Sequence, residues 1–345
     1  MKNSEIRQVQ NFKCIAMCPR QVTRMASLVL LLASLPFLLA TDTALLTGGG
    51  PVARDGCELL SSSCTLPSLP WSAATNRSGR MDHVTLATED GLVLVCGGEA
   101  ADGTDDLSCV SLDLKSGPAN QQAWTPHSTL DVSRDKATAV VLPGHGAFIL
   151  GGFKEVTSSF LPLGGTVWEA GPVLPPARDS SYYGICSVLL TDTEFLIIGG
   201  HAEGLFGGTQ VAQYDAASGA FTSWPHLYTD RWGHSCAKLG DTVVVAGGVS
   251  MAFTIMDSTT VLDLNTREER QGGRMASPRT WFGMVVVEGA LVVFGGTAGD
   301  DPLASMEEWD EVAEEWVGRE DTMAIAMYSF ASIPAKVEDF CGGRL

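Results

Sequence analysis

The chain has 345 residues, of which 45% are hydrophobic and 38 are glycine, so a folded, turn-rich protein is expected and a mainly disordered one is excluded. Acidic residues outnumber basic residues by 40 to 22, which gives a net charge of -18 at pH 7. This charge argues against nucleic acid as a partner, because phosphate binding requires a basic surface.

The first forty residues differ from the rest of the chain. An apolar run, MASLVLLLASLPFLLA (Met25–Ala40), follows five basic residues and has about the length of a signal peptide. The run is short for a membrane span, and Pro36 interrupts it. We therefore expect a cleaved leader over residues 1–40, with Met25 as an alternative start and an uncleaved anchor as the other interpretation. Residues 41–345 are then one domain, secreted or in the endomembrane lumen, with no membrane contact after cleavage.

Six hydrophobic runs in the chain end in a glycine pair. They are ALLTGGG, LVLVCGG, AFILGG, FLIIGG, VVVAGG and LVVFGG, and their last glycines are residues 50, 98, 152, 200, 248 and 296. The steps between them are therefore 48, 54, 48, 48 and 48 residues. A period of about 40 to 50 residues predicts a repeat architecture.

The repeat that starts at Arg231 shows the expected structure of one unit. A strand over residues 233–239 is followed by a turn and by a continuously apolar strand over residues 242–246, which runs into the glycine pair. A third strand, STTVLDL, and a short fourth strand complete a small antiparallel sheet. Such sheets, stacked radially, form a β-propeller, in which the second strand is apolar on both sides because it lies between neighbouring blades.

The chain resembles the kelch-repeat family over about residues 44–335. The shared features are an arginine that opens the repeat, the run into Gly-Gly, a Tyr-Asp or similar pair and a later tryptophan, as in YDAASGAFTSW (Tyr214–Trp224) and EEWDEVAEEW (Glu307–Trp316). Trp124 and Trp168 fill the same tryptophan position, whereas the fourth repeat has REERQ and no tryptophan. The resemblance implies a propeller, a fold that carries many unrelated functions.

The number of blades follows from the two ends of the chain. Five complete units begin at the opening arginines Arg80, Arg134, Arg178, Arg231 and Arg279. The segments ALLTGGG and CTLPSLP lack a first strand, and AMYSFASIPA (Ala326–Ala335) is similar to a first strand without successors. We therefore predict an all-β, six-bladed kelch-type propeller closed by the N-terminal strands and the C-terminal strand. The alternative is that CGGRL at the end of the chain begins a truncated seventh unit.

The loops after each Gly-Gly and before each opening arginine are expected on one face of the ring. Arg80, Arg134, Arg178, Arg231 and Arg279 would then surround the channel mouth and grip a carboxylate or sulfate, or each would tie its own turn together. The loop tips on the same face carry five apolar residues that either contact a partner or fold back onto the blade. They are Leu205, Phe206, Met251, Phe253 and Ile255.

Seven cysteines follow the leader. Cys96 and Cys109 fall on neighbouring strands of one blade and are predicted to pair, as are Cys57 and Cys64 on the third and fourth strands of theirs. Cys186 and Cys236 are predicted as buried thiols on adjacent blades, and Cys341 is left over. Asn76 begins the only N-x-S/T sequon of the chain and is a candidate glycosylation site.

We predict no metal site, cofactor or catalytic residue. His83 and His234 each follow an opening arginine by three residues and fill one repeat position, no histidine pair has ligand spacing, and the cysteines lack C-x-x-C. The predicted function is a monomeric extracellular or lumenal binding module for an unknown protein or glycan. A carbohydrate-active propeller enzyme, similar to galactose oxidases, sialidases or sugar-isomerising kelch proteins, is the alternative.

Overall fold

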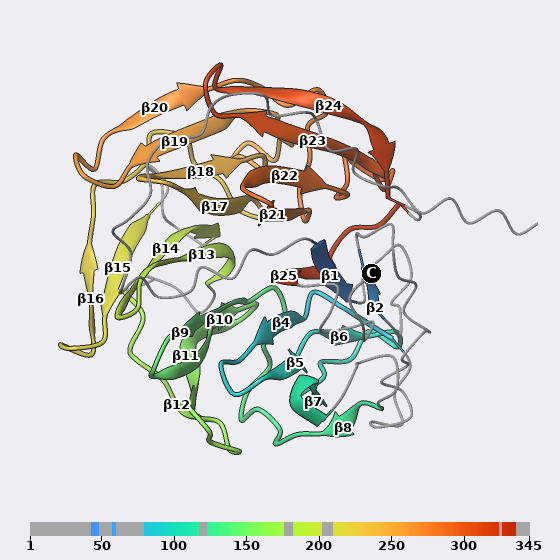
Figure 1. The fold of residues 1–345 in the computed structure, drawn as a ribbon, viewed down its shortest axis with the longest axis vertical. Coiled ribbons are helices and arrows are strands. Elements are labelled where there is room, and N and C mark those ends of the chain that lie inside the picture. Colours follow the sequence, from blue (N-terminus) through green and yellow to red (C-terminus); the bar gives the residue numbers. More distant parts are fainter. Residues whose placement is uncertain are drawn as a thin grey trace, which may run out of the picture.

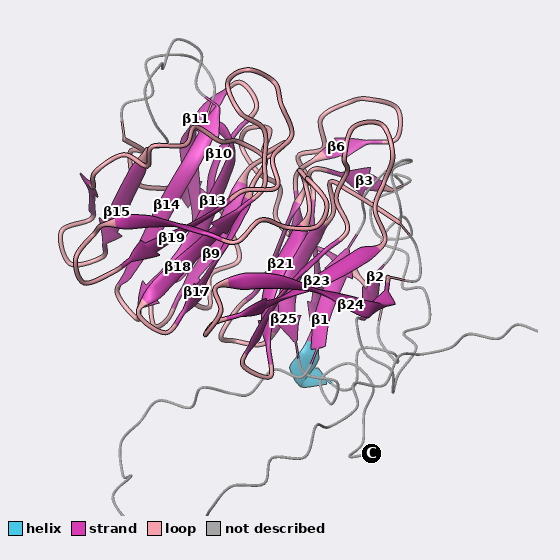
Figure 2. Ribbon diagram, turned by 90° about the horizontal axis from the view of Figure 1, so that it is seen from above, coloured by secondary structure: helices cyan, strands magenta, loops and turns pink. Residues whose placement is uncertain are grey.

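The computed structural model describes residues 43–47, 57–59, 79–116, 123–175, 182–201, 210–323 and 326–335. Small antiparallel sheets stand around a central axis in these residues, and their innermost strands surround the centre (Figure 1). Seen from the side, loops gather at the two faces of this arrangement (Figure 2). The described helical structure is one short 3-10 helix, η1 (Leu114–Ser116). Within these residues no helix is long and apolar enough to span a membrane.

Five sheets have four strands each and are called blades 1 to 5. Blade 1 contains β4 (Val84–Ala87), β5 (Leu92–Cys96), β7 (Cys109–Asp113) and β8 (Thr125–Pro126). Blade 2 contains β9 (Thr138–Leu142), β10 (Gly146–Gly152), β11 (Glu155–Pro162) and β12 (Glu169–Ala170). Blade 3 contains β13 (Tyr183–Thr191), β14 (Glu194–His201), β15 (Val211–Asp215) and β16 (Ala220–Ser223). Blade 4 contains β17 (Ser235–Leu239), β18 (Thr242–Ala246), β19 (Thr259–Asp263) and β20 (Glu269–Gly272), and blade 5 contains β21 (Gly283–Val287), β22 (Ala290–Phe294), β23 (Ser305–Asp310) and β24 (Glu315–Thr322). The two-residue strands β3 (Arg80–Met81) and β6 (Glu99–Ala100) pair above blade 1.

The remaining sheet corrects the predicted number of blades. It has three strands in the order β2 (Cys57–Leu59), β1 (Thr43–Thr47) and β25 (Ala331–Ala335), so segments from both ends of the chain lie in one sheet. The described residues thus form five complete four-stranded blades, not six. The segment CTLPSLP, from which the extra strand was expected, lies outside the described residues.

The second strand of each blade is buried on both sides, as the continuous apolar runs predict. Val93 to Val95 in β5 and Val243 to Val245 in β18 have no exposed surface. The hydrophobic clusters join neighbouring blades: Val244 of blade 4 packs in one cluster with Leu291 and Val293 of blade 5. Burial between two sheets therefore removes the polar face that a half-exposed strand would need.

Candidate functional site

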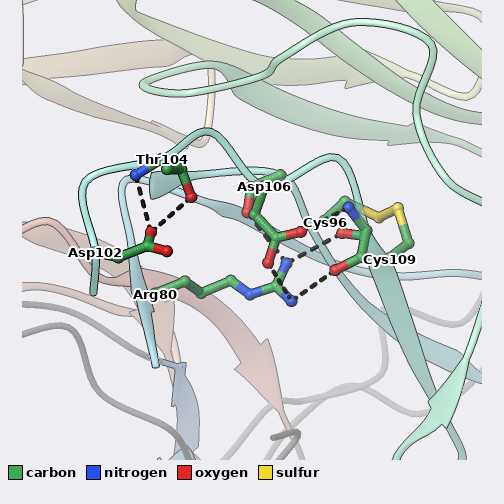
Figure 3. A network of polar contacts seen from close by, with 8 residues as sticks. Arg80, Cys96, Asp102, Thr104, Asp106 and Cys109 are labelled. Atoms are coloured by element: carbon green, nitrogen blue, oxygen red, sulfur yellow. Dashed lines mark hydrogen bonds and ion pairs between the residues drawn. A yellow bond between two sulfur atoms is a disulfide. The ribbon is translucent and has the colours of Figure 1, made fainter. Parts of the chain in front are cut away.

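Four opening arginines are buried inside their own blades. Their side chains reach across the end of the second strand, and each Nη1 donates hydrogen bonds to two carbonyl oxygens, one on the first glycine of the pair and one at the start of the third strand. Figure 3 shows this for Arg80, which also pairs with Asp106 at 3.1 Å. The acceptors are Gly97 and Ser108 for Arg80, Gly151 and Thr157 for Arg134, Gly247 and Ser258 for Arg231, and Gly295 and Ser305 for Arg279.

This geometry disagrees with the predicted anion grip. Arg80 and Arg231 are 1% and 2% exposed, and Arg134 and Arg279 are fully buried, so none of the four guanidinium groups faces a ligand. Burial lowers the pKa of Arg231 to about 10. The four arginines therefore tie their own turns together, which was the other interpretation of the sequence.

Blade 3 replaces this arginine by a tyrosine. Arg178 lies outside the described residues. Each of the other four arginines lies two residues before a residue with left-handed backbone. In blade 3 that residue is Gly184, and Tyr182, which is 1% exposed, holds the matching position before it. Its hydroxyl donates to Gln210 Oε1 at 3.4 Å, at the start of the third strand. The assignment of Arg178 as the opening arginine of this blade is therefore corrected.

Six residues with left-handed backbone form a continuous cycle of hydrogen bonds around the axis. Each lies just before or at the start of the first strand of a sheet, and its N–H donates to the carbonyl oxygen of the matching residue in the preceding sheet at 2.9 to 3.0 Å. Their φ angles lie between 54° and 65°. They are Asp82, Lys136, Gly184, Gly233, Trp281 and Ser329. Since every N–H and C=O of this cycle is used, a ligand here would meet side chains instead of backbone groups.

A central cavity of about 110 Å³ opens at this cycle of residues and is called the channel mouth. Trp281 covers one side of it. A Cβ on Gly184 would come within 3.3 Å of the Trp281 ring and 2.7 Å of Gly233 N, and a Cβ on Gly233 would come within 3.1 Å of the same ring. Two glycines are therefore needed because the indole lies directly against them.

The opposite side of the channel mouth is charged. Lys136 Nζ lies 2.9 Å from Asp82 Oδ2 and 3.0 Å from Asp135 Oδ2. Burial, together with the charges of Asp82 and Glu99, raises the pKa of Asp135 to about 6 even though Lys136 opposes this shift. Burial disfavours the charged amine of Lys136, but the two carboxylates outweigh it and raise its pKa. Asp82 Oδ1 is buried and has no hydrogen-bond partner among the described residues.

Four aromatic side chains from successive blades form a row that ends at Trp281, which lines the channel mouth. We call them the aromatic arc: Phe153, Tyr183, Trp232 and Trp281. Their rings meet edge to face with centroid distances of 5.3, 5.8 and 5.8 Å. Phe153 is 42% exposed and the other three are half-buried. Sequence reasoning missed this arc, although an aromatic residue directly follows the opening position in Tyr182-Tyr183 and Arg231-Trp232.

The predicted loop tip after β18 is only partly exposed. Phe253 is 76% exposed and Met251 and Ile255 are half-buried. Ile255 forms a β-bridge with Val249, so part of the loop folds back onto its blade. Leu205 and Phe206 lie outside the described residues. A binding role for this loop stays a prediction.

The cysteines confirm one predicted pair and contradict one predicted pair of thiols. Cys96 and Cys109 face each other on β5 and β7 and form a disulfide with a Cα–Cα distance of 4.2 Å. Cys186 and Cys236 are also disulfide-bonded, at a Cα–Cα distance of 6.0 Å, because the first strands of blades 3 and 4 lie side by side near the axis. Cys64, Asn76 and the side chain of Cys57, which is the first residue of β2, lie outside the described residues. The second predicted disulfide and the glycan therefore stay predictions.

The two repeat-position histidines are buried between the sheets. Burial and the nearby charges of Arg80 and Arg231 lower the pKa values of His83 and His234 to about 3. His83 Nε2 is 2.8 Å from Thr47 Oγ1 of β1. Within the described residues there is no group of three histidine, cysteine or acidic side chains that could hold a metal ion.

Comparison with known families identifies the repeat. The family model of the Kelch motif matches residues 278–317, which include the buried Arg279 and end at Val317, near the start of the fourth strand of blade 5. No curated protein matches the chain in a sequence comparison. Four of the five blades share the bond from an opening arginine to the glycine pair that this matched segment contains. The matched motif and the propeller arrangement of the sheets together support a kelch-repeat β-propeller family for this chain.

Proposed function

We propose that this chain is an extracellular or lumenal protein-interaction module that binds its partner on the face that carries the channel mouth. The aromatic arc carries the proposal: four adjacent rings stay partly exposed on a rigid ring of sheets. Partly exposed aromatic side chains on a rigid scaffold are typical of interaction surfaces. The exposed Phe253 lies in a loop on the same face, because it follows the second strand of its blade.

The three-stranded sheet supports a closed ring. β25 contacts the first strands of blades 5 and 1, β21 and β4, and Ser329 supplies the sixth link of the hydrogen-bond cycle. We infer that this sheet holds the two ends of the propeller together. A closed ring keeps the binding face rigid and covers the apolar faces that the first and last blades would otherwise expose.

The location rests on the sequence and on the cysteines. The leader over residues 1–40 has the pattern of a signal peptide. Disulfides persist mainly in oxidising compartments, so the bonds Cys96–Cys109 and Cys186–Cys236 support an extracellular or lumenal site of action.

Affinity capture tests the proposal. The full chain is immobilised, exposed to extracellular fluid, and the retained proteins are identified by mass spectrometry. We expect a secreted protein whose retention falls with Phe253→Ala but not with Val312→Ala, because Val312 is 96% exposed on the β23–β24 turn at the opposite face. Both variants should keep the melting temperature, since exposed positions change stability by about 0.5 kcal/mol.

Two results would contradict the proposal. Retention of only chaperones and cytosolic proteins would count against the location and the binding role. Turnover of sialosides or galactosides by the full chain, with or without added copper, would favour the carbohydrate-active alternative.

A further inference from the structure

The channel mouth contains a hydrogen-bond acceptor that the protein itself does not use. The side chain of Asp82 is 6% exposed and lines the central cavity. Lys136 occupies Oδ2, whereas Oδ1 is buried and has no hydrogen-bond partner among the described residues. A buried carboxylate oxygen accepts hydrogen bonds and donates none, so a ligand that completes this site must bring a donor.

The charges around Asp82 favour a positively charged donor. Asp82 and Glu99 both lie close enough to Asp135 to raise its pKa, and Lys136 is the amine that pairs with Asp82 and Asp135. Lys136 balances one of these three carboxylates. Lys154 lies over the Phe153 ring at 5.1 Å. A cation that enters beside Asp82 gains a charge-assisted hydrogen bond, whereas an anion would meet an excess of negative charge.

The other side of the mouth offers an aromatic surface to the same cation. Trp281 lines the cavity together with Asp82, and Trp232 packs against its edge. Indole faces attract ammonium and guanidinium groups, most strongly where water is excluded. The mouth therefore combines a carboxylate acceptor with an aromatic wall across a single small cavity.

The size of the cavity limits what can enter. At about 110 Å³ it is smaller than the roughly 300 to 1,000 Å³ of sites that enclose whole small molecules. It has room for the end of one side chain. We propose that the channel mouth receives a lysine or arginine side chain of the partner protein, with Asp82 Oδ1 as its acceptor and Trp281 as its aromatic wall. This inference rests on the proposed function and specifies the chemistry of its partner.

Two sets of peptides test the inference on the full chain by isothermal titration calorimetry. One set carries a single central arginine or citrulline, and the other a single central lysine or norleucine, in otherwise identical uncharged sequences. Citrulline keeps the shape of arginine and removes its charge. We expect the arginine and lysine peptides to bind at least about tenfold more tightly than their neutral counterparts, the effect typical of a hydrogen bond to a charged group.

Variants of the protein assign this preference to the channel mouth. Asp82→Asn should bring the charged peptides to within about twofold of the neutral ones, because the lost charge-assisted bond carries the discrimination. Asparagine tolerates the left-handed conformation of residue 82, so the cycle of backbone hydrogen bonds is kept. Asp300→Asn is the matched control, because it removes the same charge from an exposed loop on the same face. Trp281→Leu should also weaken the binding of the charged peptides.

The outcomes separate this inference from the proposed function. Equal affinity of the arginine and citrulline peptides for the unaltered chain would overturn the inference without the need for any variant. Equal effects of Asp82→Asn and Asp300→Asn would overturn it as well, because the preference would then come from the general charge of the face. If the chain still captures a secreted partner in either case, the interaction function stands. If it captures none, the proposed function fails whatever the peptides show.

Discussion

Replacing Arg279 by methionine tests whether the opening arginines hold the blades together. The Arg279 side chain is fully buried, donates to the carbonyl oxygens of Gly295 and Ser305 at 2.9 and 3.2 Å, and pairs with Glu307 at 2.6 Å. Methionine fills much of the volume of the arginine stem but removes the donor to Gly295 O and to Glu307, whereas Ser305 O keeps the bond that it accepts from Gly295 N–H at 3.3 Å. Glu307 keeps only the bond that it accepts from Ala276 N–H at 2.7 Å.

The expected loss of stability is large for one substitution. Removing one partner of a buried ion pair costs about 3 to 5 kcal/mol, because the other charge stays buried and uncompensated. A folded domain has about 5 to 15 kcal/mol of stability in total. Arg279→Met should therefore lower the free energy of unfolding by about 3 to 5 kcal/mol. Adding Glu307→Gln should restore part of this loss, because it removes the uncompensated charge and keeps an acceptor for Ala276.

Urea unfolding followed by tryptophan fluorescence measures these changes, since Trp309 and Trp316 lie in the same blade. Arg274→Met is the matched control. Arg274 is 74% exposed and pairs with Asp257 at 2.6 Å, so its loss should change the free energy of unfolding very little. If Arg279→Met is no more destabilising than Arg274→Met, the structural role of the opening arginines is refuted and the anion-grip interpretation returns.

Three further measurements address the rest of the fold. The folded-state pKa values of His83 and His234 lie near 3, below the ordinary 6.5, so the unfolded chain binds protons first and the free energy of unfolding should fall as the pH drops from about 6.5 to 3. In urea titrations at stepped pH, His234→Gln should reduce this loss by up to about 5 kcal/mol. An unchanged pH profile would contradict the buried neutral state of His234. Peptide mapping without reduction should recover Cys186 linked to Cys236, and two free thiols there would contradict the bond. From their 50-residue separation, replacing both cysteines by alanine should lower the free energy of unfolding by about 4 kcal/mol. Deleting residues 326–345 removes β25 and Ser329 and should lower the melting temperature of the whole propeller, whereas an unchanged melting temperature would show that the three-stranded sheet does not hold the ends together.

The repeat and its internal order were readable from the sequence because they depend on neighbours within one unit. The run LVLVCGG predicted a strand buried on both sides, and Val93 to Val95 in that run are fully buried. Cys96 and Cys109, 13 residues apart, could be paired from the order of strands alone, because adjacent antiparallel strands bring such positions face to face. Local hydrophobic pattern and turn residues carry this information.

Sequence reasoning placed the arginines at the channel mouth and left their orientation open between ligand and turn. The repeat shows that an arginine precedes each first strand, but only the folded blade shows its side chain crossing to the glycine carbonyls. It also shows that Tyr182 takes this position in blade 3, which the spacing of Arg178 concealed.

The features of the channel mouth depend on contacts between blades, which sequence spacing does not encode. The Cys186–Cys236 bond, the approach of Lys136 to Asp82 and the packing of Trp281 over Gly184 each join residues about 50 to 100 positions apart in the sequence. The sequence by itself determined the repeat unit, its buried strands and the resemblance to kelch repeats, because these follow from residues that lie within one blade. Only the tertiary structure decided which side chains meet at the axis, because the radial packing of separate blades brings them together.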